Sequence, residues 1–208
     1  MRSMLTEAIR AKVTEALKGA TYVYIDAANL ELSVKDMYVD LKDIPDELAA
    51  YKASDLCWRV NYQKLYNFFQ DQCDLQCVHF FSADFETDNH RRFMAKLKHI
   101  GYRITTKPLK RYSDHTPEKP NRKANFDVEL SILAVKHKKD FKTLVLFSGD
   151  CDFEYLLKYL RGRGKKCVTF SRQGHIAHEL PPASNQYFDV IDFRHEFLEV
   201  QRKKVPGT

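Results

Sequence analysis

The chain has 208 residues, of which 44% are hydrophobic and 30% charged, a composition that indicates a globular domain with a substantial core rather than a disordered chain. No run approaches the ~18 consecutive apolar residues of a membrane-spanning helix, and charged side chains interrupt the first twenty residues, unlike a secretory signal. Five cysteines without a Cys-x-x-Cys pair argue against a disulfide framework. We therefore expect a cytoplasmic protein with no membrane partner. The net charge of +6 is compatible with an anionic partner.

The first predicted element is an amphipathic helix over residues 5–18. Apolar residues recur every four positions from Leu5 to Leu17, and Gly19 follows as a stop signal. Such a helix packs either on its own domain or on a partner, so a homodimer is one arrangement that the sequence leaves open.

From residue 21 onward, short apolar stretches rich in β-formers alternate with amphipathic stretches. Strands are predicted over 21–25, 75–81, 102–106, 165–170 and 187–191, with a further buried strand that begins at Leu144 and stops at Ser148-Gly149. Helices are predicted over 61–71, 89–99, 126–135 and 153–160. This alternation predicts an α/β domain whose mostly parallel sheet is covered by helices on both faces.

Three segments do not follow the alternation. Residues 31–60 are typical of a helical insertion or lid with a break near Pro45. Residues 107–123 contain three prolines without periodicity, which predicts a long loop. The end of the chain from residue 194 is predicted to be a basic tail that frays from Arg202.

Four aspartates fall near one edge of the predicted sheet. Asp26 ends the first strand, and Asp150 follows the fourth, with Asp152 one step beyond it. Asp127 begins the helix that leads into the fourth strand. Carboxyl ends of parallel strands share one edge, and α/β proteins bind ligands there, where the strand order reverses. If the first and fourth strands are neighbours, the four carboxylates converge; the alternative for Asp152 is a helix cap.

Carboxylates that converge repel one another unless a cation compensates them. Oxygen ligands suit Mg²⁺ or Mn²⁺, and the absence of histidine from these strand ends argues against zinc. Neither a glycine-rich phosphate loop nor a Gly-x-Ser-x-Gly elbow is present. A carboxylate-held divalent cation suits hydrolysis of a phosphodiester, because it activates water and stabilises the charge of the transition state.

Basic residues near the same edge predict an RNA-binding surface. The loop of residues 107–123 leaves the third strand there with an excess of positive charge, and the helix over 89–99 begins there. The candidate contacts to RNA are Arg91, Arg92, Lys107, Lys110, Arg111, Tyr112, Arg122 and Lys123. The alternative is a solvated loop without a ligand.

The blocks around these aspartates resemble the signatures of NYN domains, in the LabA-like branch of the PIN-like nuclease superfamily. The matching stretches are Tyr-Val-Tyr-Ile-Asp26-Ala-Ala-Asn29-Leu, Lys123-Ala-Asn-Phe-Asp127 and Phe-Ser148-Gly-Asp150-Cys-Asp152-Phe153. The resemblance covers about residues 21–193, which leaves an N-terminal helix over 1–20 and a tail over 194–208 outside the domain. It implies a three-layer α/β/α sandwich.

The resemblance also implies a metal-dependent ribonuclease site. The acidic positions of the family correspond to Asp26, Asp127, Asp150 and Asp152, both as catalytic residues and as ligands of Mg²⁺ or Mn²⁺, with Asn29 and Ser148 as supporting polar residues. Cys151 stands where family members often have glycine, and its side chain is bulky enough to crowd the metal. We expect an endoribonuclease, with a non-catalytic RNA-binding or regulatory protein-interaction module of the same fold as the alternative. A small-molecule phosphohydrolase fits less well, because the first strand lacks an Asp-x-Asp pair.

Overall fold

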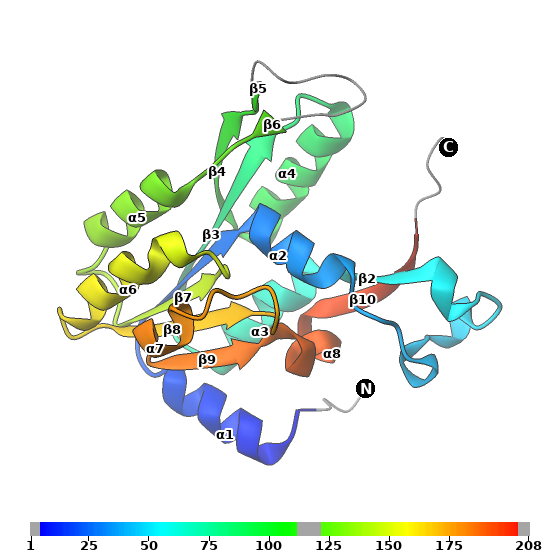
Figure 1. The fold of residues 1–208 in the computed structure, drawn as a ribbon, viewed down its shortest axis with the longest axis horizontal. Coiled ribbons are helices and arrows are strands. Elements are labelled where there is room, and N and C mark those ends of the chain that lie inside the picture. The colour runs from blue at the N-terminus through cyan, green and yellow to red at the C-terminus, as the bar shows by residue number, and fades with distance from the viewer. Residues whose placement is uncertain (1–4, 112–121, 204–208) are drawn as a thin grey trace.

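The computed structural model describes residues 5–111 and 122–203, with side chains at all of these positions except 110, 111, 122 and 123. Six parallel strands form the central sheet (Figure 1). Their spatial order is β4 (Arg103–Pro108), β3 (Leu75–Asp84), β1 (Thr21–Asp26), β7 (Thr143–Phe147), β8 (Lys166–Ser171) and β9 (Gln186–Asp189). The predicted α/β class and three-layer architecture are confirmed.

The strand order reverses between β1 and β7. From β1 the chain builds outward through β3 to β4, and it then returns to the other side of β1 to build β7, β8 and β9. In the two registers, Asp26 lies opposite Phe81 of β3 and Ile25 opposite Phe147 of β7. The carboxyl ends of β1 and β7 are therefore side by side at the reversal point, the arrangement on which convergence of the aspartates depends.

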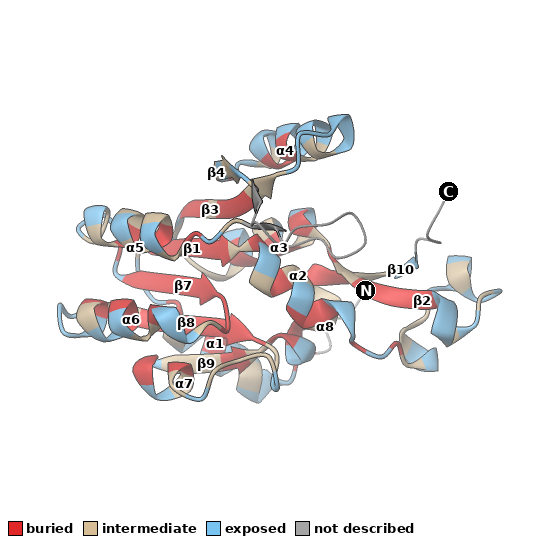
Figure 2. Cartoon of the chain, turned by 45° about the horizontal axis from the view of Figure 1, so that its top comes forward, coloured by how far each residue is buried: buried red, intermediate tan, exposed pale blue. Residues whose placement is uncertain are grey.

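Helices cover both faces of the sheet, because successive side chains of each strand point to opposite faces and both sets are apolar. In β1, Val23 and Ile25 face one layer, while Tyr22 and Tyr24 face the other. The first layer contains α1 (Glu7–Ala16), α2 (Ala27–Lys35), α3 (Tyr62–Gln72), α4 (Asp88–Ile100) and α8 (Arg194–Phe197). The second contains α5 (Asp127–Lys136), α6 (Glu154–Arg161) and α7 (Leu180–Ala183). Figure 2 shows β1, β7 and β8 buried between these layers.

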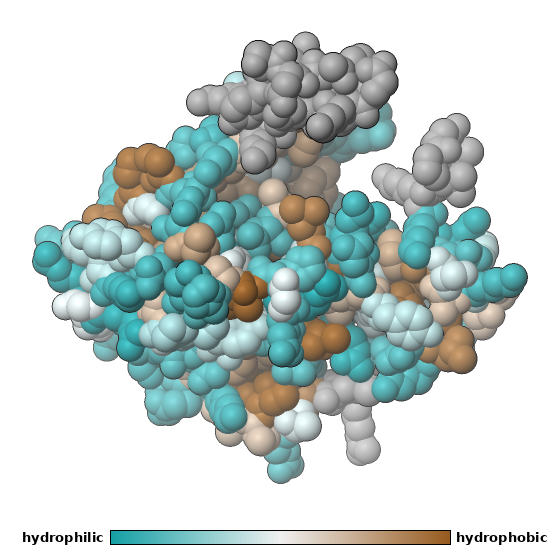
Figure 3. All heavy atoms as spheres, viewed as in Figure 1, coloured by the Kyte–Doolittle hydropathy of each residue, from teal (hydrophilic) through white to brown (hydrophobic). Residues whose placement is uncertain are grey.

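The N-terminal helix packs on its own domain. Val13 of α1 and Leu17, which follows the helix, are both buried in the first layer. Within the described ranges no helix is both long and apolar enough to cross a bilayer. All five cysteines are free. On the face that carries α2, α5 and α6, hydrophilic residues predominate, with a hydrophobic group over α5, where Val128 and Ile132 are exposed (Figure 3).

The segment over 31–60 and the end of the chain form a second, small sheet. After α2, three short 3₁₀ helices (Leu41–Asp43, Asp46–Leu48 and Ala53–Asp55) lead to β2 (Leu56–Val60), which pairs antiparallel with β10 (Leu198–Arg202). This pair projects from the main body beside α2 (Figures 1 and 2). The nearly buried carboxylate of Asp43 accepts from Nε of Arg194 at 3.1 Å and ties the segment to α8.

These contacts correct the prediction of a tail from residue 194. Phe197 and Leu198 are buried in the first layer, and the strand that follows is paired through Arg202. The prediction of a long loop is corrected in part as well, because β5 (Lys110–Arg111) and β6 (Arg122–Lys123) pair as a short antiparallel ladder.

Candidate functional site

Asp26 joins β1 to α2 and is the residue from which the site is built. It is the last residue of the strand and the N-cap of the helix, and its Oδ1 accepts the backbone N–H of Asn29 at 3.3 Å. Burial raises the pKa of its carboxyl from 3.8 to about 6, opposed by the N–H of Asn29 and reinforced by the charges of Asp127 and Asp150. A negative charge at this position is therefore costly in the protein alone.

Asn29 and Ser148 shape the turn that follows β7. Oδ1 of Asn29 accepts the backbone N–H of Gly149 at 2.8 Å, which ties the first turn of α2 to the end of β7. Ser148 is buried, and its Oγ accepts the N–H of Asp150 at 3.2 Å. Both side chains bond to backbone, so they fix where the carboxylate of Asp150 lies relative to Asp26.

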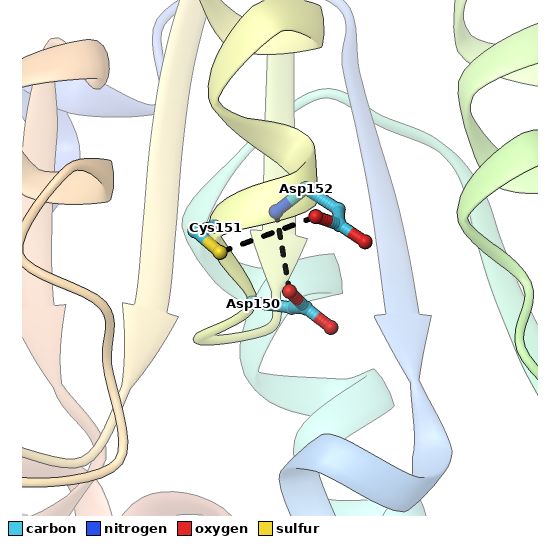
Figure 4. A group of neighbouring side chains, drawn as sticks. All are labelled: Asp150, Cys151 and Asp152. Carbon is cyan, nitrogen blue, oxygen red and sulfur yellow. Dashed lines mark hydrogen bonds between the residues drawn. The ribbon is translucent and has the colours of Figure 1, made fainter.

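Asp150 and Asp152 occupy one tight turn. Oδ1 of Asp150 accepts the N–H of Asp152 at 3.1 Å and caps the 3₁₀ helix Cys151–Phe153. The ligand atoms of Asp150, Cys151 and Asp152 lie within 4.8 Å of one another. In Figure 4 the two carboxylates lie on the side of the turn toward β1, and the sulfur of Cys151 lies on the other side. The cysteine is exposed, and its Sγ lies 4.0 Å from Oδ1 of Asp152, so it borders the acids.

Asp127 reaches the same place from a third part of the chain. It is the first residue of α5, and its N–H donates to Oδ1 of Asn125 at 2.9 Å. The pKa of its carboxyl is raised by burial first and also by the charges of Asp150 and Asp152, while the Asn125 side chain lowers it. Asp26, Asp127 and Asp150 line one cleft of about 640 Å³, and Asp152 borders Asp127 from the exposed side of the turn.

The donor set fits a hard divalent cation. Its members are four carboxylates, and within the described ranges none of the four forms an ion pair with a lysine, arginine or histidine. Burial raises the pKa of Asp26 and of Asp127, and the charges of neighbouring aspartates raise both further, so negative charge is crowded among these described residues. Oxygen-only ligands around uncompensated charge are what Mg²⁺ and Mn²⁺ bind.

The predicted RNA-binding residues differ in whether their side chains are exposed, paired within the fold or not described. Nζ of Lys107 donates to Oε1 of Glu129 at 2.7 Å and lies 4.8 Å from the ring centre of Phe126, so this lysine holds β4 to α5. Arg91 and Arg92 are exposed at the start of α4, and Arg91 pairs with Asp88 at 3.0 Å. The remaining candidates lie where side chains are not described (Lys110, Arg111, Arg122 and Lys123) or outside the described residues (Tyr112).

Sequence reasoning missed the apolar part of the cleft. Beyond the carboxylates, the lining includes aromatic side chains from the end of β3 and from α4, among them Phe85 and Phe93. In the sequence they belong to an ordinary strand end and an ordinary amphipathic helix. The one feature of the sequence that could have indicated an apolar wall of the cleft is Phe85, a large apolar residue directly after Asp84, where the strand ends.

The packing of the turn after β7 requires glycine at position 149, and the stability of a Gly149 variant tests this requirement. A Cβ built on Gly149 would lie 1.9 Å from the carbonyl oxygen of His175. We expect Gly149→Ala to cost about 1–3 kcal/mol in the free energy of unfolding, as overpacking does, measured by urea denaturation. Gly162→Ala is the matched control, because its Cβ would meet only ordinary contacts at 3.4 Å or more. Equal stabilities of the two variants would contradict the close approach.

Comparison with known proteins gives three findings. The family model for the NYN domain matches residues 20–192. The low amplitude and bright protein LabA of Synechococcus elongatus (strain ATCC 33912 / PCC 7942 / FACHB-805) is 29% identical over 152 residues, which are 72% of this chain and 81% of that protein. A crystal structure of a protein of unknown function from Vibrio parahaemolyticus RIMD 2210633 superposes with a TM-score of 0.63 at 17% identity, over 88% of this chain and 97% of that one. The last shows a shared fold.

Proposed function

Because the chain belongs to the NYN domain family, as a LabA-like member of the PIN-like nuclease superfamily, we propose that it is a metal-dependent endoribonuclease. It hydrolyses phosphodiester bonds of RNA at the carboxylate cluster on the carboxyl edge of the sheet. The partner is RNA and the cofactor is Mg²⁺ or Mn²⁺.

One observation carries the proposal. Asp26, Asp127 and Asp150 come from three distant parts of the chain and meet in one cleft, beside Asp152 and without a described cationic partner. Crowded carboxylates reduce stability, so a fold that keeps them together has a use for the charge. Charge of this kind, opened to solvent in a cleft, is suited to a cation and to the phosphate that the cation attracts.

Each residue has a distinct role in this proposal. Asp26 and Asp150 would hold the cation, and Asp127 and Asp152 would complete the donor set or accept hydrogen bonds from the attacking water. When bound, the cation supplies Lewis acidity toward the phosphate and lowers the pKa of water. Asn29 and Ser148 act indirectly, because their hydrogen bonds to the backbone of Gly149 and Asp150 hold the turn in position.

RNA approaches from the same edge of the sheet. Leu109, between β4 and β5, lines the cleft, so the β5–β6 hairpin leaves the body beside the acids. Arg91 and Arg92 are exposed at the start of α4. We assign them, together with the basic residues of the hairpin, to phosphates of the strand on either side of the cleavage point.

The test is cleavage of a single-stranded RNA by the purified chain. We expect internal cuts with Mn²⁺, no cuts with EDTA, and no cuts from Asp150→Asn prepared in the same way. Asp71→Asn is the matched control, because this exposed aspartate lies at the end of α3, at the opposite edge of the sheet, and it should cut like the wild type. Absence of cleavage in every condition, or equal cleavage by Asp150→Asn, would contradict the proposal. RNA that is bound but never cut would favour the non-catalytic alternative.

A further inference from the structure

The cleft that contains the carboxylates continues into an aromatic compartment. The aspartates line the part near the ends of β1 and β7, while Phe80 and Phe85 line the part at the end of β3 and His90 and Phe93 the part on α4. A cation site needs no aromatic wall. The volume of about 640 Å³ for the whole cleft is in the range that holds one small organic ligand, so the cleft as a whole has room for a chemical group next to the phosphate.

Phe85 stands at the mouth of this compartment with much of its ring free. Its side chain is 53% exposed, although it is large and apolar. The edge-to-face contact with His90 has a ring separation of 5.0 Å. The turn that presents it is tight, because Glu86 has φ of +55° and its N–H donates to Oδ1 of Asp84 at 2.9 Å. Non-glycine residues adopt positive φ at a cost, and such strain is found at binding sites.

The compartment also contains an unused hydrogen-bonding group. Nε2 of His90 is buried, and no hydrogen-bond partner for it exists among the described residues. A buried polar atom without a partner costs free energy. Farther along the same wall, the hydroxyl of Tyr62 donates to Oε1 of Glu31 at 2.7 Å, so that polar pair is already satisfied. His90 therefore brings a buried, unpaired polar atom to the wall of this compartment.

A flat group with hydrogen-bonding edges that is attached to a phosphate matches these features. We infer that the aromatic compartment binds one nucleobase of the RNA strand, next to the phosphate that is cleaved, with Phe85 stacked on its face and His90 hydrogen-bonded to its edge. This inference rests on the proposed function, because it is the proposed function that identifies the bound polymer as RNA. It adds a substrate requirement, namely a base that is unpaired and unstacked from its neighbour, so single-stranded RNA is the substrate and a continuous duplex is excluded.

The inference can be tested without catalysis, by comparing how AMP and ribose 5-phosphate bind to the whole chain with Mg²⁺ present. Base–aromatic stacking changes affinity by about 5- to 150-fold per base, so AMP should bind more tightly than ribose 5-phosphate by a factor in that range, measured by NMR titration. Phe85→Ala should remove most of this preference, and Phe85→Trp should keep it. His90→Ala should weaken AMP binding while leaving ribose 5-phosphate unchanged.

Tyr38→Ala is the matched control, because Tyr38 is an exposed aromatic residue that does not line the cleft. It should keep the full preference for AMP. Equal binding of AMP and ribose 5-phosphate to the wild type, no AMP binding at millimolar concentration, or an unchanged preference in Phe85→Ala would each overturn the inference. If AMP is preferred through Phe85 while RNA is never cut, the base site stands and the proposed hydrolysis fails. If RNA is cut but AMP is not preferred through Phe85, the proposed hydrolysis stands and the base site fails.

Discussion

Replacing Asp26 by asparagine is expected to abolish RNA cleavage and, when divalent cations are removed, to make the protein more stable. Loss of one proposed metal ligand should lower cleavage by more than about 100-fold, since even outer partners of metal sites cost 10- to 100-fold. The asparagine keeps an oxygen for the N–H of Asn29 and removes a buried charge that Asp127 and Asp150 repel. Raising the pKa from 3.8 to about 6 corresponds to about 3 kcal/mol at most, so we expect a gain of about 1–3 kcal/mol.

The size of the effect depends on pH. The pKa of Asp26 is higher in the folded than in the unfolded chain, so ionisation of Asp26 destabilises the fold, and this penalty appears as pH rises from about 4 through 6. The gain from Asp26→Asn should be complete at pH 7 and absent at pH 4, measured by urea unfolding in EDTA. Saturating Mn²⁺ should stabilise the wild type more than the variant. Asp71→Asn should change neither, and a variant less stable than the wild type in EDTA at pH 7 would contradict the argument.

Phe197→Ala is expected to lower the free energy of unfolding by about 3–5 kcal/mol, the usual cost of removing a buried phenylalanine side chain. Phe197 is fully buried, although it lies within the stretch from residue 194 that the sequence predicts to be a basic tail. Its ring lies 5.6 Å from that of Phe193, 5.7 Å from that of Phe68 and 5.8 Å from that of Phe147. The cavity would therefore open against β7, the strand that leads to Asp150.

Urea denaturation of Phe197→Ala beside Tyr38→Ala measures this directly. Tyr38 is 74% exposed, so its truncation should cost less than about 0.5 kcal/mol. Similar small losses for both variants would mean that the last helix and strand are dispensable for the fold.

Much of the fold could be predicted from the sequence because the elements of the main sheet have local signatures. The residues of β7 are all buried, so the strand is a continuous apolar run, and α3 repeats its apolar residues at helical spacing. Alternation of such elements implies a parallel sheet, and a parallel sheet brings the ends of β1 and β7 to one edge. That is why Asp26 and Asp150 could be placed together before any coordinates.

Features that depend on distant partners could not be predicted. β10 is short, and its register with β2 joins Leu198 to Val60, residues far apart in the chain with no local signal of pairing. Lys107 has the charge of a phosphate contact, but its partner Glu129 is brought to it by the position of α5. The aromatic compartment was missed for the same reason, because Phe85 and His90 acquire meaning only when β3 and α4 are placed beside the acids.

The pairing of β2 with β10 has a consequence for when the acidic site can form during synthesis. β2 packs against α2, the helix that Asp26 caps, and the only strand that pairs with β2 in the described chain is β10. The small sheet therefore cannot close until Arg202 has been made, long after Asp26, Asp127 and Asp150. Contacts between residues so far apart close late and slowly. A growing chain on a ribosome thus carries all four aspartates before α2, the helix that Asp26 caps, has its complete support.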